Sequence, residues 1–464
     1  MNEAKIEVDI LVIGGDVITM NPTGEVLNDG ALAIRGNQIV AVGSTVEIKA
    51  TYTASEIIDA HQHVVMPGLI DSHTHTAQQF QRSLVKWLGR QRPFKEPVWQ
   101  TLLFPFEASL TEEDMHLSGL FAYANMLKVG TTTFADSGGP CPEALAPAIE
   151  QIGIRGVLAR STVDATDGIP REMTDTVAGI IQKNESLFNQ WHGKAQGRIR
   201  VWMGMRQIMV CSEDLLHAVR GLADQFNTGI HIHLAEGPYE VDWAIIHAGQ
   251  RPTEYLASRG FLSKGVHAAH SVMLSERELD LYQDYDVSVG HCPVAMFSYT
   301  GVAKVPEMLR RKLRVGLGSD GAAFSGGSLD LFQQMKMAYH THSVVYGMPY
   351  RDISPVSQED MLEVATLGGA RALRWDAEIG SLEAGKKADL ILLSIDDLDV
   401  MPSYDPLHTA SSSASGAQVR TVIVDGRVVV RNGKLMTMDE QALREEIRAR
   451  APKIVERFLK RIDR

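Results

Sequence analysis

Histidine and aspartate residues of metal-binding type stand at the ends of strand-like segments in this sequence. His73 and His75 close the segment PGLIDSHTH, and side chains two residues apart on an extended strand point to the same side. His233 lies in HIHLAE and Asp320 in GLGSDG. Three imidazoles and one carboxylate suit a single Zn²⁺ or Fe²⁺ ion. We therefore expect one divalent metal held by His73, His75, Asp320 and a histidine of HIHLAE.

Three other histidines could be considered as metal ligands. His61 and His63 form a second HxH pair, but they precede the PG turn in a β-rich segment, and we interpret them as surface residues. His231 alternates with His233, and spacing alone does not choose between these two or exclude a joint role. Glu236, three residues after His233 at the strand exit, favours His233.

These residues permit hydrolytic chemistry, and one reaction open to them is removal of an amino group from a nitrogen heterocycle. A bound divalent metal lowers the pKa of its water from about 15.7 toward about 7, which gives hydroxide at neutral pH. Asp320 is suited to take the proton from that water. Glu236 would protonate the ring nitrogen, and His270, at the end of HAAH, would orient the water or stabilise the developing oxygen charge. The hydroxide attacks the ring carbon, and the amine leaves as ammonia.

Residues so far apart in sequence can meet only if the fold brings several strand ends to one rim. Short apolar runs alternate with helix-like segments, as buried parallel strands do. Eight runs fit this pattern: Val64–His75, Gly130–Asp136, Arg155–Thr162, Arg200–Met205, Gly229–Glu236, Gly265–His270, Val287–Pro293 and Arg314–Gly321. We predict an α/β fold, a closed (β/α)₈ TIM barrel whose strand ends form the site. An open doubly wound sheet is the alternative, and the absence of a GxGxxG or GxxxxGK[ST] loop weakens it.

The β-rich texture of the N-terminal segment returns near the other end of the chain. We predict a small β-sandwich domain built from residues 1–64 and 380–464, with the barrel over residues 65–379. Residues 439–464 predict an amphipathic helix interrupted near Pro452, with its Lys and Arg residues on a solvated face.

The composition and net charge of the sequence limit the classes of partner that we expect for the protein. A formal net charge of −12 over 464 residues argues against nucleic-acid binding, which depends on Lys and Arg. Three well-separated cysteines indicate a reducing compartment rather than a disulfide framework. The start of the sequence shows no leader pattern, and no run has the ~18–20 apolar residues of a membrane helix. We expect a cytoplasmic protein with a small-molecule substrate and no membrane partner.

A family resemblance rests on the motifs VVMPGLIDSHTH, GTTTFAD, HIHLAE, HAAHSVMLSERELDL, HCPVAM, VGLGSDGAA and GSLEAGKKADLILL, followed by VIVDGRVVV. In this order they resemble the amidohydrolase superfamily, and within it the branch of methylthioadenosine/S-adenosylhomocysteine deaminases and triazine hydrolases. The resemblance implies metal ligands at His73, His75, His233 and Asp320, and catalytic roles for Glu236 and His270. It also implies a barrel with a small β domain and Zn²⁺ or Fe²⁺ as the metal, of which we favour Zn²⁺. Dimers are common among such barrels, so it allows a homo-oligomer.

The substrate is expected to be an aminated purine, pterin or related ring, with adenosine-type nucleosides the first subclass. In FPFE, Glu107 matches a Pro-x-Glu element that contacts ribose hydroxyls in the adenosine-type deaminases, although it could also cap a helix. Gln78, Gln79 or Gln81 could bind the edge of the heterocycle; we take Gln79 and Arg82 as candidate substrate residues.

Three departures from the family pattern lie on loops expected to line the pocket. Arg82-Ser83 replaces the usual Arg-Gly, and Ala295-Met296 replaces the usual Ser-Asn. The stretch from Arg82 to Glu107 is long and includes the basic GRQRPFKEP, which could meet an acidic substituent. These departures suggest a substrate different from the commonest one of the family.

Alternative functions are a triazine (chloro)hydrolase and a cyclic-amide hydrolase. The second is disfavoured because no metal-bridging lysine follows the fourth strand, RVWMGMRQIMV. A non-catalytic binding barrel would have lost metal ligands or Glu236, and this sequence keeps them.

Overall fold

The computed structural model describes residues 4–91, 93–95, 97–297, 299–352 and 354–463, and it contains two compact units. The first comprises Met1–Asp71, Ala124–Thr133 and Asp330–Asp439, and the second comprises Ser72–Tyr123, Phe134–Leu329 and Glu440–Arg464. Residues 330–379 thus group with the first unit and residues 440–464 with the second. The predicted domain boundaries at residues 64 and 379 stay predictions.

An eight-stranded sheet forms the predicted barrel. Its strands follow one another in sequence order, and the registers resolved between neighbours from β8 to β13 are parallel. The strands are β6 (Leu69–Thr74), β7 (Thr131–Asp136), β8 (Arg155–Ala159), β9 (Ile199–Met205), β10 (Ile230–Leu234), β11 (Val266–His270), β12 (Ser288–His291) and β13 (Val315–Leu317). The first and last strands approach each other, since the Ser72 hydroxyl donates to the Leu317 carbonyl at 2.9 Å. This nearly closed ring confirms the (β/α)₈ prediction.

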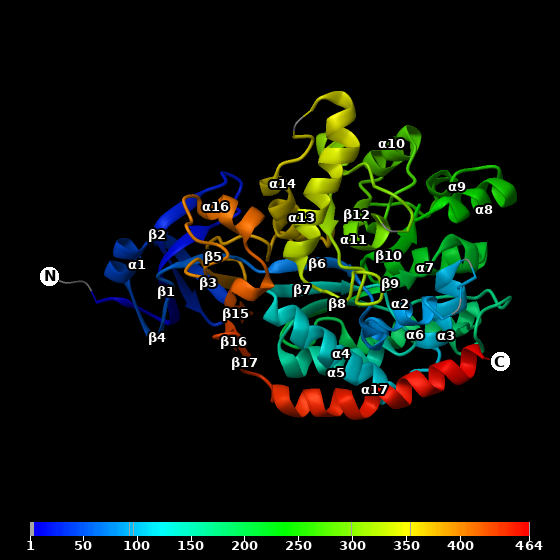
Figure 1. Ribbon diagram of the computed structural model, residues 1–464, viewed down its shortest axis with the longest axis horizontal. Helices are drawn as coiled ribbons and strands as arrows, with labels where there is room; N and C mark the ends of the chain where they lie inside the picture. Colours follow the sequence, from blue (N-terminus) through cyan, green and yellow to red (C-terminus); the bar gives the residue numbers. More distant parts are fainter. Residues whose placement is uncertain (1–3, 92, 96, 298, 353, 464) are drawn as a thin grey trace. The chain divides into compact units, whose positions relative to one another are not determined.

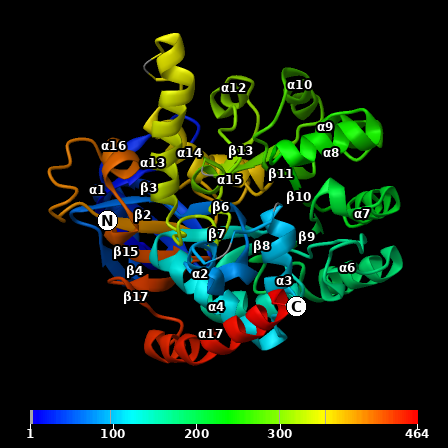
Figure 2. The same ribbon diagram turned by 45° about the vertical axis from the view of Figure 1, so that its right-hand side comes forward.

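Helices cover the outside of this sheet, as Figures 1 and 2 show for α6, α7 and α10. Connecting helices are α4 (Glu112–Lys128), α5 (Leu145–Ile152), α6 (Val177–Trp191), α7 (Glu213–Gln225), α8 (Pro238–Ala248), α9 (Pro252–Ser258), α10 (Glu276–Asp284) and α12 (Val305–Arg310). Their starts follow ordinary capping rules: Ser212 caps α7 through the amide of Leu215, and Ser275 forms a capping box with Glu278 at α10.

The predicted single strand Val64–His75 is wrong, because the chain forms two strands there. β5 (His63–Pro67) pairs with strands of the other sheet, and β6 begins one residue later, after Gly68. A Cβ atom at Gly68 would lie 2.1 Å from the Thr132 hydroxyl, so only glycine fits at this approach. The continuous apolar run in the sequence concealed this break.

A nine-stranded mixed sheet belongs to the first unit and draws strands from both ends of the chain, as predicted. Its order is β17-β16-β15-β14-β5-β1-β2-β3, with β4 beside β1. The strands are β1 (Ile6–Ile18), β2 (Val26–Arg35), β3 (Gln38–Ser44), β4 (Tyr52–Asp59), β5, β14 (Leu390–Ser394), β15 (Val419–Val424), β16 (Arg427–Arg431) and β17 (Lys434–Leu435). Alternating residues of β1 join two separate apolar clusters, so both faces of this sheet are buried there. The same unit contains α13 (Leu331–His342) and α14 (Gln358–Ala365).

The last helix, α17 (Glu440–Ile462), runs through Pro452 without the predicted interruption. Arg444, Arg448, Lys453 and Lys460 are exposed, as expected for a solvated face, whereas two other arginines make buried contacts. Arg450 and Arg457 both pair with Asp114, whose side chain is completely buried. Phe458, also fully buried, packs against Phe106 with ring centroids 5.3 Å apart. These contacts hold α17 within the second unit.

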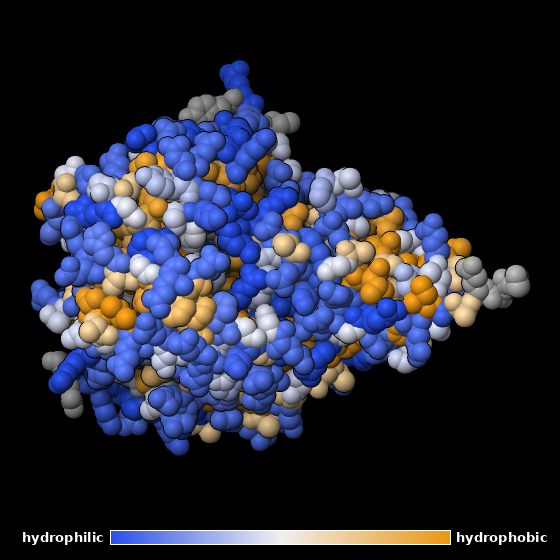
Figure 3. Space-filling model, turned by 180° about the vertical axis from the view of Figure 1, so that it is seen from behind, coloured by the Kyte–Doolittle hydropathy of each residue, from blue (hydrophilic) through white to orange (hydrophobic). Residues whose placement is uncertain are grey.

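The face of the molecule seen in Figure 3 is mostly hydrophilic, and its apolar patches are separated by polar residues. Among the residues described, no helix has both the length and the apolar character needed to cross a membrane.

Candidate metal and substrate site

The predicted metal-binding residues lie at the carboxyl ends of barrel strands. His73 belongs to β6 and His75 follows it, His233 belongs to β10, and Asp320 comes three residues after β13. All four are buried, with at most 6% of their surface exposed. Parallel strands of a barrel open onto one rim, which is why these residues meet.

The donor atoms of these residues converge on one point. His73 Nε2 and His75 Nε2 lie 3.2 and 3.4 Å from Asp320 Oδ1, and His75 Nε2 lies 3.1 Å from His233 Nε2. Donor atoms of His73, His75 and Asp320 lie within 4.8 Å of one another, and so do those of His73, His233 and His270. A single cation placed among them would be within reach of three imidazoles and a carboxylate, a donor set that suits Zn²⁺ or Fe²⁺.

Hydrogen bonds on the outer side of each imidazole orient its inner nitrogen. His75 Nδ1 lies 2.8 Å from the Ser137 hydroxyl, and His233 Nδ1 lies 2.9 Å from the carbonyl oxygen of Arg206. His73 Nδ1 lies 2.8 Å from His231 Nε2. A carbonyl oxygen only accepts, so His233 carries its proton on Nδ1 and leaves the Nε2 lone pair free for a metal.

These contacts answer the question that spacing left open between the two histidines of HIHLAE. His233 directs Nε2 into the donor cluster, whereas His231 bonds to the outer nitrogen of His73. His231 therefore orients the ring of the candidate ligand His73 by contacting its outer nitrogen.

Burial sets the charge of the cluster. Removal from water lowers the pKa of His73 to about 3 and holds that of His233 well below its ordinary value. Burial alone would raise the pKa of Asp320, but the neighbouring His270, His73 and His75 outweigh it and keep the carboxyl ionised. His73 and His233 are thus neutral nitrogen donors beside an ionised carboxylate.

The chain takes unusual backbone conformations next to this cluster. His270 has φ 72° and Asp320 has φ 60°, both in the left-handed region, and Ala235, just before Glu236, has φ 52°. Such conformations are uncommon outside glycine and cluster at functional sites. They turn these side chains into the opening above the strands.

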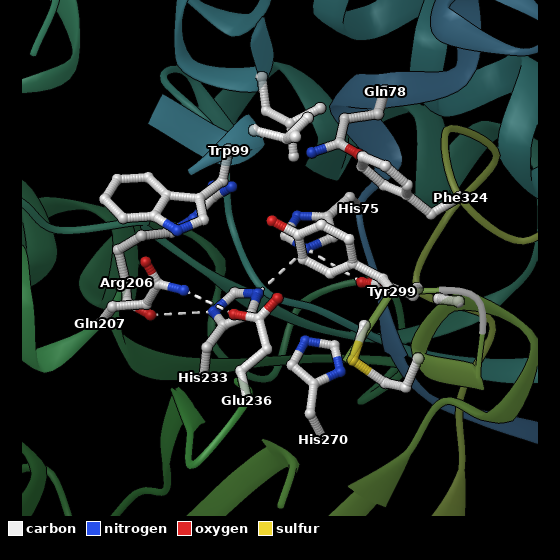
Figure 4. Close-up of a pocket in the computed structure, with 15 residues that line it drawn as sticks. His75, Gln78, Trp99, Arg206, Gln207, His233, Glu236, His270, Tyr299 and Phe324 are labelled. Carbon is white, nitrogen blue, oxygen red and sulfur yellow. Dashed lines mark hydrogen bonds and ion pairs between the residues drawn. The ribbon is translucent and has the colours of Figure 1, made fainter. Parts of the chain in front are cut away.

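A partly enclosed cavity lies over the cluster. Figure 4 shows its residues, with His75, His233, Glu236 and His270 facing one another. The other walls are largely apolar and aromatic, as a flat heterocycle requires. The cavity is lined by His75, Gln78, Val98, Trp99, Leu103, Arg206, Gln207, His233, Glu236, His270, Ala295, Met296, Tyr299, Asp320 and Phe324.

Glu236 is held in place from two sides. Gln207 Nε2 donates to Glu236 Oε2 at 2.6 Å, and the Glu236 amide donates to Glu240 Oε2 at 2.8 Å. His270 lies against His233, with ring centroids 5.2 Å apart. Both predicted catalytic side chains therefore border the cavity and the donor cluster.

The three candidate substrate residues do not line this cavity. Glu107 is fully buried one layer behind it, where it accepts from Gln78 Nε2 at 2.8 Å and from Arg206 Nη1 at 3.2 Å. Gln79 is buried away from the cavity, and its neighbour Gln78 takes the lining position. Arg82 lies over the Phe121 ring, 5.0 Å from its centroid, and lines a separate hollow.

Arg206 and Gln207 are site residues that the sequence analysis missed. They directly follow β9, so the rule that identified the other strand ends could have found them. Of the departures from the family pattern, Ala295 and Met296 do line the cavity. The long stretch before Glu107 supplies Trp99 and Leu103 to its wall, whereas Arg92 and Glu96 of GRQRPFKEP lie outside the described residues.

Comparison with known proteins agrees with this arrangement. The model of the amidohydrolase family matches residues 64–429. This chain belongs to the amidohydrolase family. The 5'-deoxyadenosine deaminase of Methanobrevibacter smithii is 34% identical over 97% of this chain and 98% of its own. The 5-methylthioadenosine/S-adenosylhomocysteine deaminase of Acetivibrio thermocellus is 33% identical over 96% and 100%.

A solved structure shows the same fold with a metal. An adenosine deaminase from Xanthomonas campestris with bound zinc superposes on this amidohydrolase with a TM-score of 0.88 and 27% identity, over 98% of this chain and 100% of its own. The resemblance to the branch of methylthioadenosine/S-adenosylhomocysteine deaminases is therefore confirmed.

Proposed function

We propose that this amidohydrolase is a metal-dependent deaminase that replaces the amino group of a nitrogen heterocycle with oxygen and releases ammonia. The observation that carries the proposal is the meeting of two sets of side chains in one cavity. Four candidate ligands, His73, His75, His233 and Asp320, adjoin two candidate proton-transfer residues, Glu236 and His270.

The donor set fits one divalent metal, and we propose Zn²⁺. Neutral imidazoles with inward Nε2 lone pairs and an ionised carboxylate are the ligands that this ion prefers. The residues after β9 are Arg206 and Gln207, not a bridging lysine, which favours a single metal. The bound metal would activate a water molecule by lowering its pKa to about 7.

The side chains around the cavity have separate roles in the proposed reaction. The Asp320 carboxylate accepts a proton from the attacking water. Because Oε2 of Glu236 is held by Gln207, Oε1 is the oxygen left to exchange a proton with the ring nitrogen. His270 borders the same space and orients the water or stabilises the developing oxygen charge. Aromatic walls, including Trp99 and Phe324, hold the ring and exclude bulk water.

The relatives' names point to adenosine-type nucleosides as the first substrates to test, with guanine-like and pterin rings next. Triazine (chloro)hydrolysis uses the same attack with a different leaving group and stays an alternative, as does cyclic-amide hydrolysis. The cytoplasmic location, the homo-oligomer and the ribose contact of Glu107 stay predictions.

The test is ammonia release from the zinc-loaded protein across aminated purines, pterins, pyrimidines and triazines, with chloride followed for chlorotriazines. We expect release from at least one ring, its loss on chelation and its return with metal. His73→Ala and Asp320→Ala should lose both metal and turnover. The matched control is His61→Ala in the other HxH pair, an exposed residue that should keep both. Full metal content and turnover in either site variant would contradict the proposal.

A further inference from the structure

An open hollow in the surface of the second unit is separate from the cavity over the donor cluster, since the two share no lining residue. Its wall is formed mainly by α2 (Leu84–Gly89) and the residues on either side of that helix, together with one residue of α17. The lining of this basic hollow includes Arg82, Ser83, Lys86, Trp87, Arg90 and Val455.

The basic hollow presents positive charge that is not neutralised by an acid in its own wall. Arg82, Lys86 and Arg90 line it, and no carboxylate of the described residues does. Lys86 and Arg90 are exposed and lie one helical turn apart, where like charges repel each other. The chain as a whole carries 57 acidic and 45 basic residues, so a hollow with three cations and no acid runs against its composition. An anion bound there would remove this repulsion.

The innermost cation of the three is held in a fixed place. The Arg82 guanidinium lies over the ring of Phe121, 5.0 Å from its centroid. Burial lowers the pKa of Arg82 from its ordinary value, because the guanidinium is partly removed from water. An anion in the basic hollow would stabilise the charged form of this side chain.

Two further features of the wall suit a ligand. Ser83, an exposed residue between Arg82 and α2, has φ 61° in the left-handed region, a conformation that costs energy outside glycine and clusters at binding sites. Trp87 leaves 49% of its surface exposed, although it is a large apolar side chain. An exposed indole beside cations offers a flat face on which the ring of an anionic ligand can stack.

We propose that the basic hollow is a second binding site, which takes a phosphorylated molecule with a flat ring, that is, a nucleotide. Its phosphate accepts charge-assisted hydrogen bonds from Lys86 and Arg90 in the field of Arg82, and its ring stacks on Trp87. Arg90 belongs to the basic stretch GRQRPFKEP, and it lines this hollow rather than the cavity. Binding here does not depend on the deaminase function proposed above.

The experiment measures binding of inosine 5′-monophosphate to the zinc-loaded full-length protein by calorimetry. This probe carries one phosphate and a purine ring, and it has no exocyclic amino group that a deaminase could remove. Inosine and inorganic phosphate each supply one half of it. We expect the nucleotide to bind at least about tenfold more tightly than either half, and its affinity to fall as salt is added.

Variants locate the binding and divide it between charge and ring. Lys86→Glu and Arg90→Glu should each weaken the nucleotide by at least about tenfold. The matched control is Lys434→Glu, an exposed lysine on β17 that does not line the hollow, and it should leave the affinity unchanged. Trp87→Leu should reduce the preference for the nucleotide over inorganic phosphate, whereas Trp87→Phe, which keeps a flat ring, should retain most of it.

Four results would overturn the proposal. The first is no binding of inosine monophosphate up to about 5 mM. The second is binding that persists in Lys86→Glu and Arg90→Glu, which would place the nucleotide elsewhere, such as in the cavity. The third is inosine that binds as tightly as its monophosphate, and the fourth is inorganic phosphate that does so. If a variant does not fold, the comparison of the three probes and the salt dependence on the unaltered protein still decide.

Discussion

The buried pair formed by Glu107 and Arg206 is open to a quantitative test through Glu107→Gln. The side chain of Glu107 is 0% exposed and that of Arg206 2% exposed, with Arg206 Nη1 3.2 Å from Glu107 Oε2. Neutralising the acid leaves a buried guanidinium without its counter-charge. Removing one partner of such a pair costs about 3–5 kcal/mol of the free energy of unfolding.

The assay is thermal unfolding followed by calorimetry. At roughly 2 °C per kcal/mol for a large domain, the melting temperature should fall by about 6–10 °C. Gln78 and Arg206 line the cavity and both bond to Glu107, so KM should also rise. The double variant Glu107→Gln/Arg206→Met removes both charges and should recover most of the lost stability.

The matched control is Glu456→Gln, which breaks an ion pair with Lys460 on the exposed face of α17. Glu456 and Lys460 are both more than half exposed, so their ion pair contributes no more than about 0.5 kcal/mol to the free energy of unfolding. A loss below about 1 kcal/mol for Glu107→Gln, or a double variant no more stable than the single one, would refute the reasoning.

Two further predictions concern side chains around the donor cluster. Ser137→Ala removes the hydroxyl that orients His75 Nδ1, and zinc affinity, measured by competition with a chelator, should weaken about 10–100-fold. Glu240→Gln tests a buried acid whose pKa is raised to about 8, first by burial and then by Glu236 and Glu278. Its raised pKa means that the folded protein holds a proton which the unfolded chain releases above about pH 4.5. Stability due to this group is present at low pH and is lost as the pH rises toward 8, by up to about 1.4 kcal/mol per pH unit. The advantage of Glu240→Gln over the unaltered protein should therefore grow from pH 5 to pH 8.

For each of these two predictions there is a measurement that would contradict it. Ser161→Ala is the control for Ser137→Ala, because Ser161 is a buried serine whose hydroxyl has no hydrogen-bond partner in the described structure. Equal zinc affinities in the two variants would exclude the orienting role. A stability difference for Glu240→Gln that stays constant with pH would show that Glu240 is ionised in the folded protein.

The sequence predicted the barrel and the positions of the donor cluster because both follow from one local rule. Apolar runs mark buried strands, and polar residues at their carboxyl ends must share a rim, which placed His73, His233 and Asp320 together. The same rule applied to the run before Arg206 and Gln207 would have added both of them.

Other features depend on contacts that no local pattern contains. After His75 the chain enters a 3₁₀ turn, Thr76–Gln81, in which each residue turns by about a third of a circle, so Gln78 rather than Gln79 lines the cavity. The break at Gly68 depends on Thr132, far away in sequence. The helix through Pro452 is held by tertiary contacts of Arg450 and Phe458, which offset the missing hydrogen bond.

The left-handed backbone at His270 and Asp320 sets stability against activity at these positions. A non-glycine residue in this region costs about 1 kcal/mol, and glycine would remove that cost together with the side chain that the chemistry needs. A library of variants selected only for heat resistance would therefore accumulate inactive proteins with glycine at these two positions. Selection for turnover must be applied at the same time if thermostable and active forms are to be recovered.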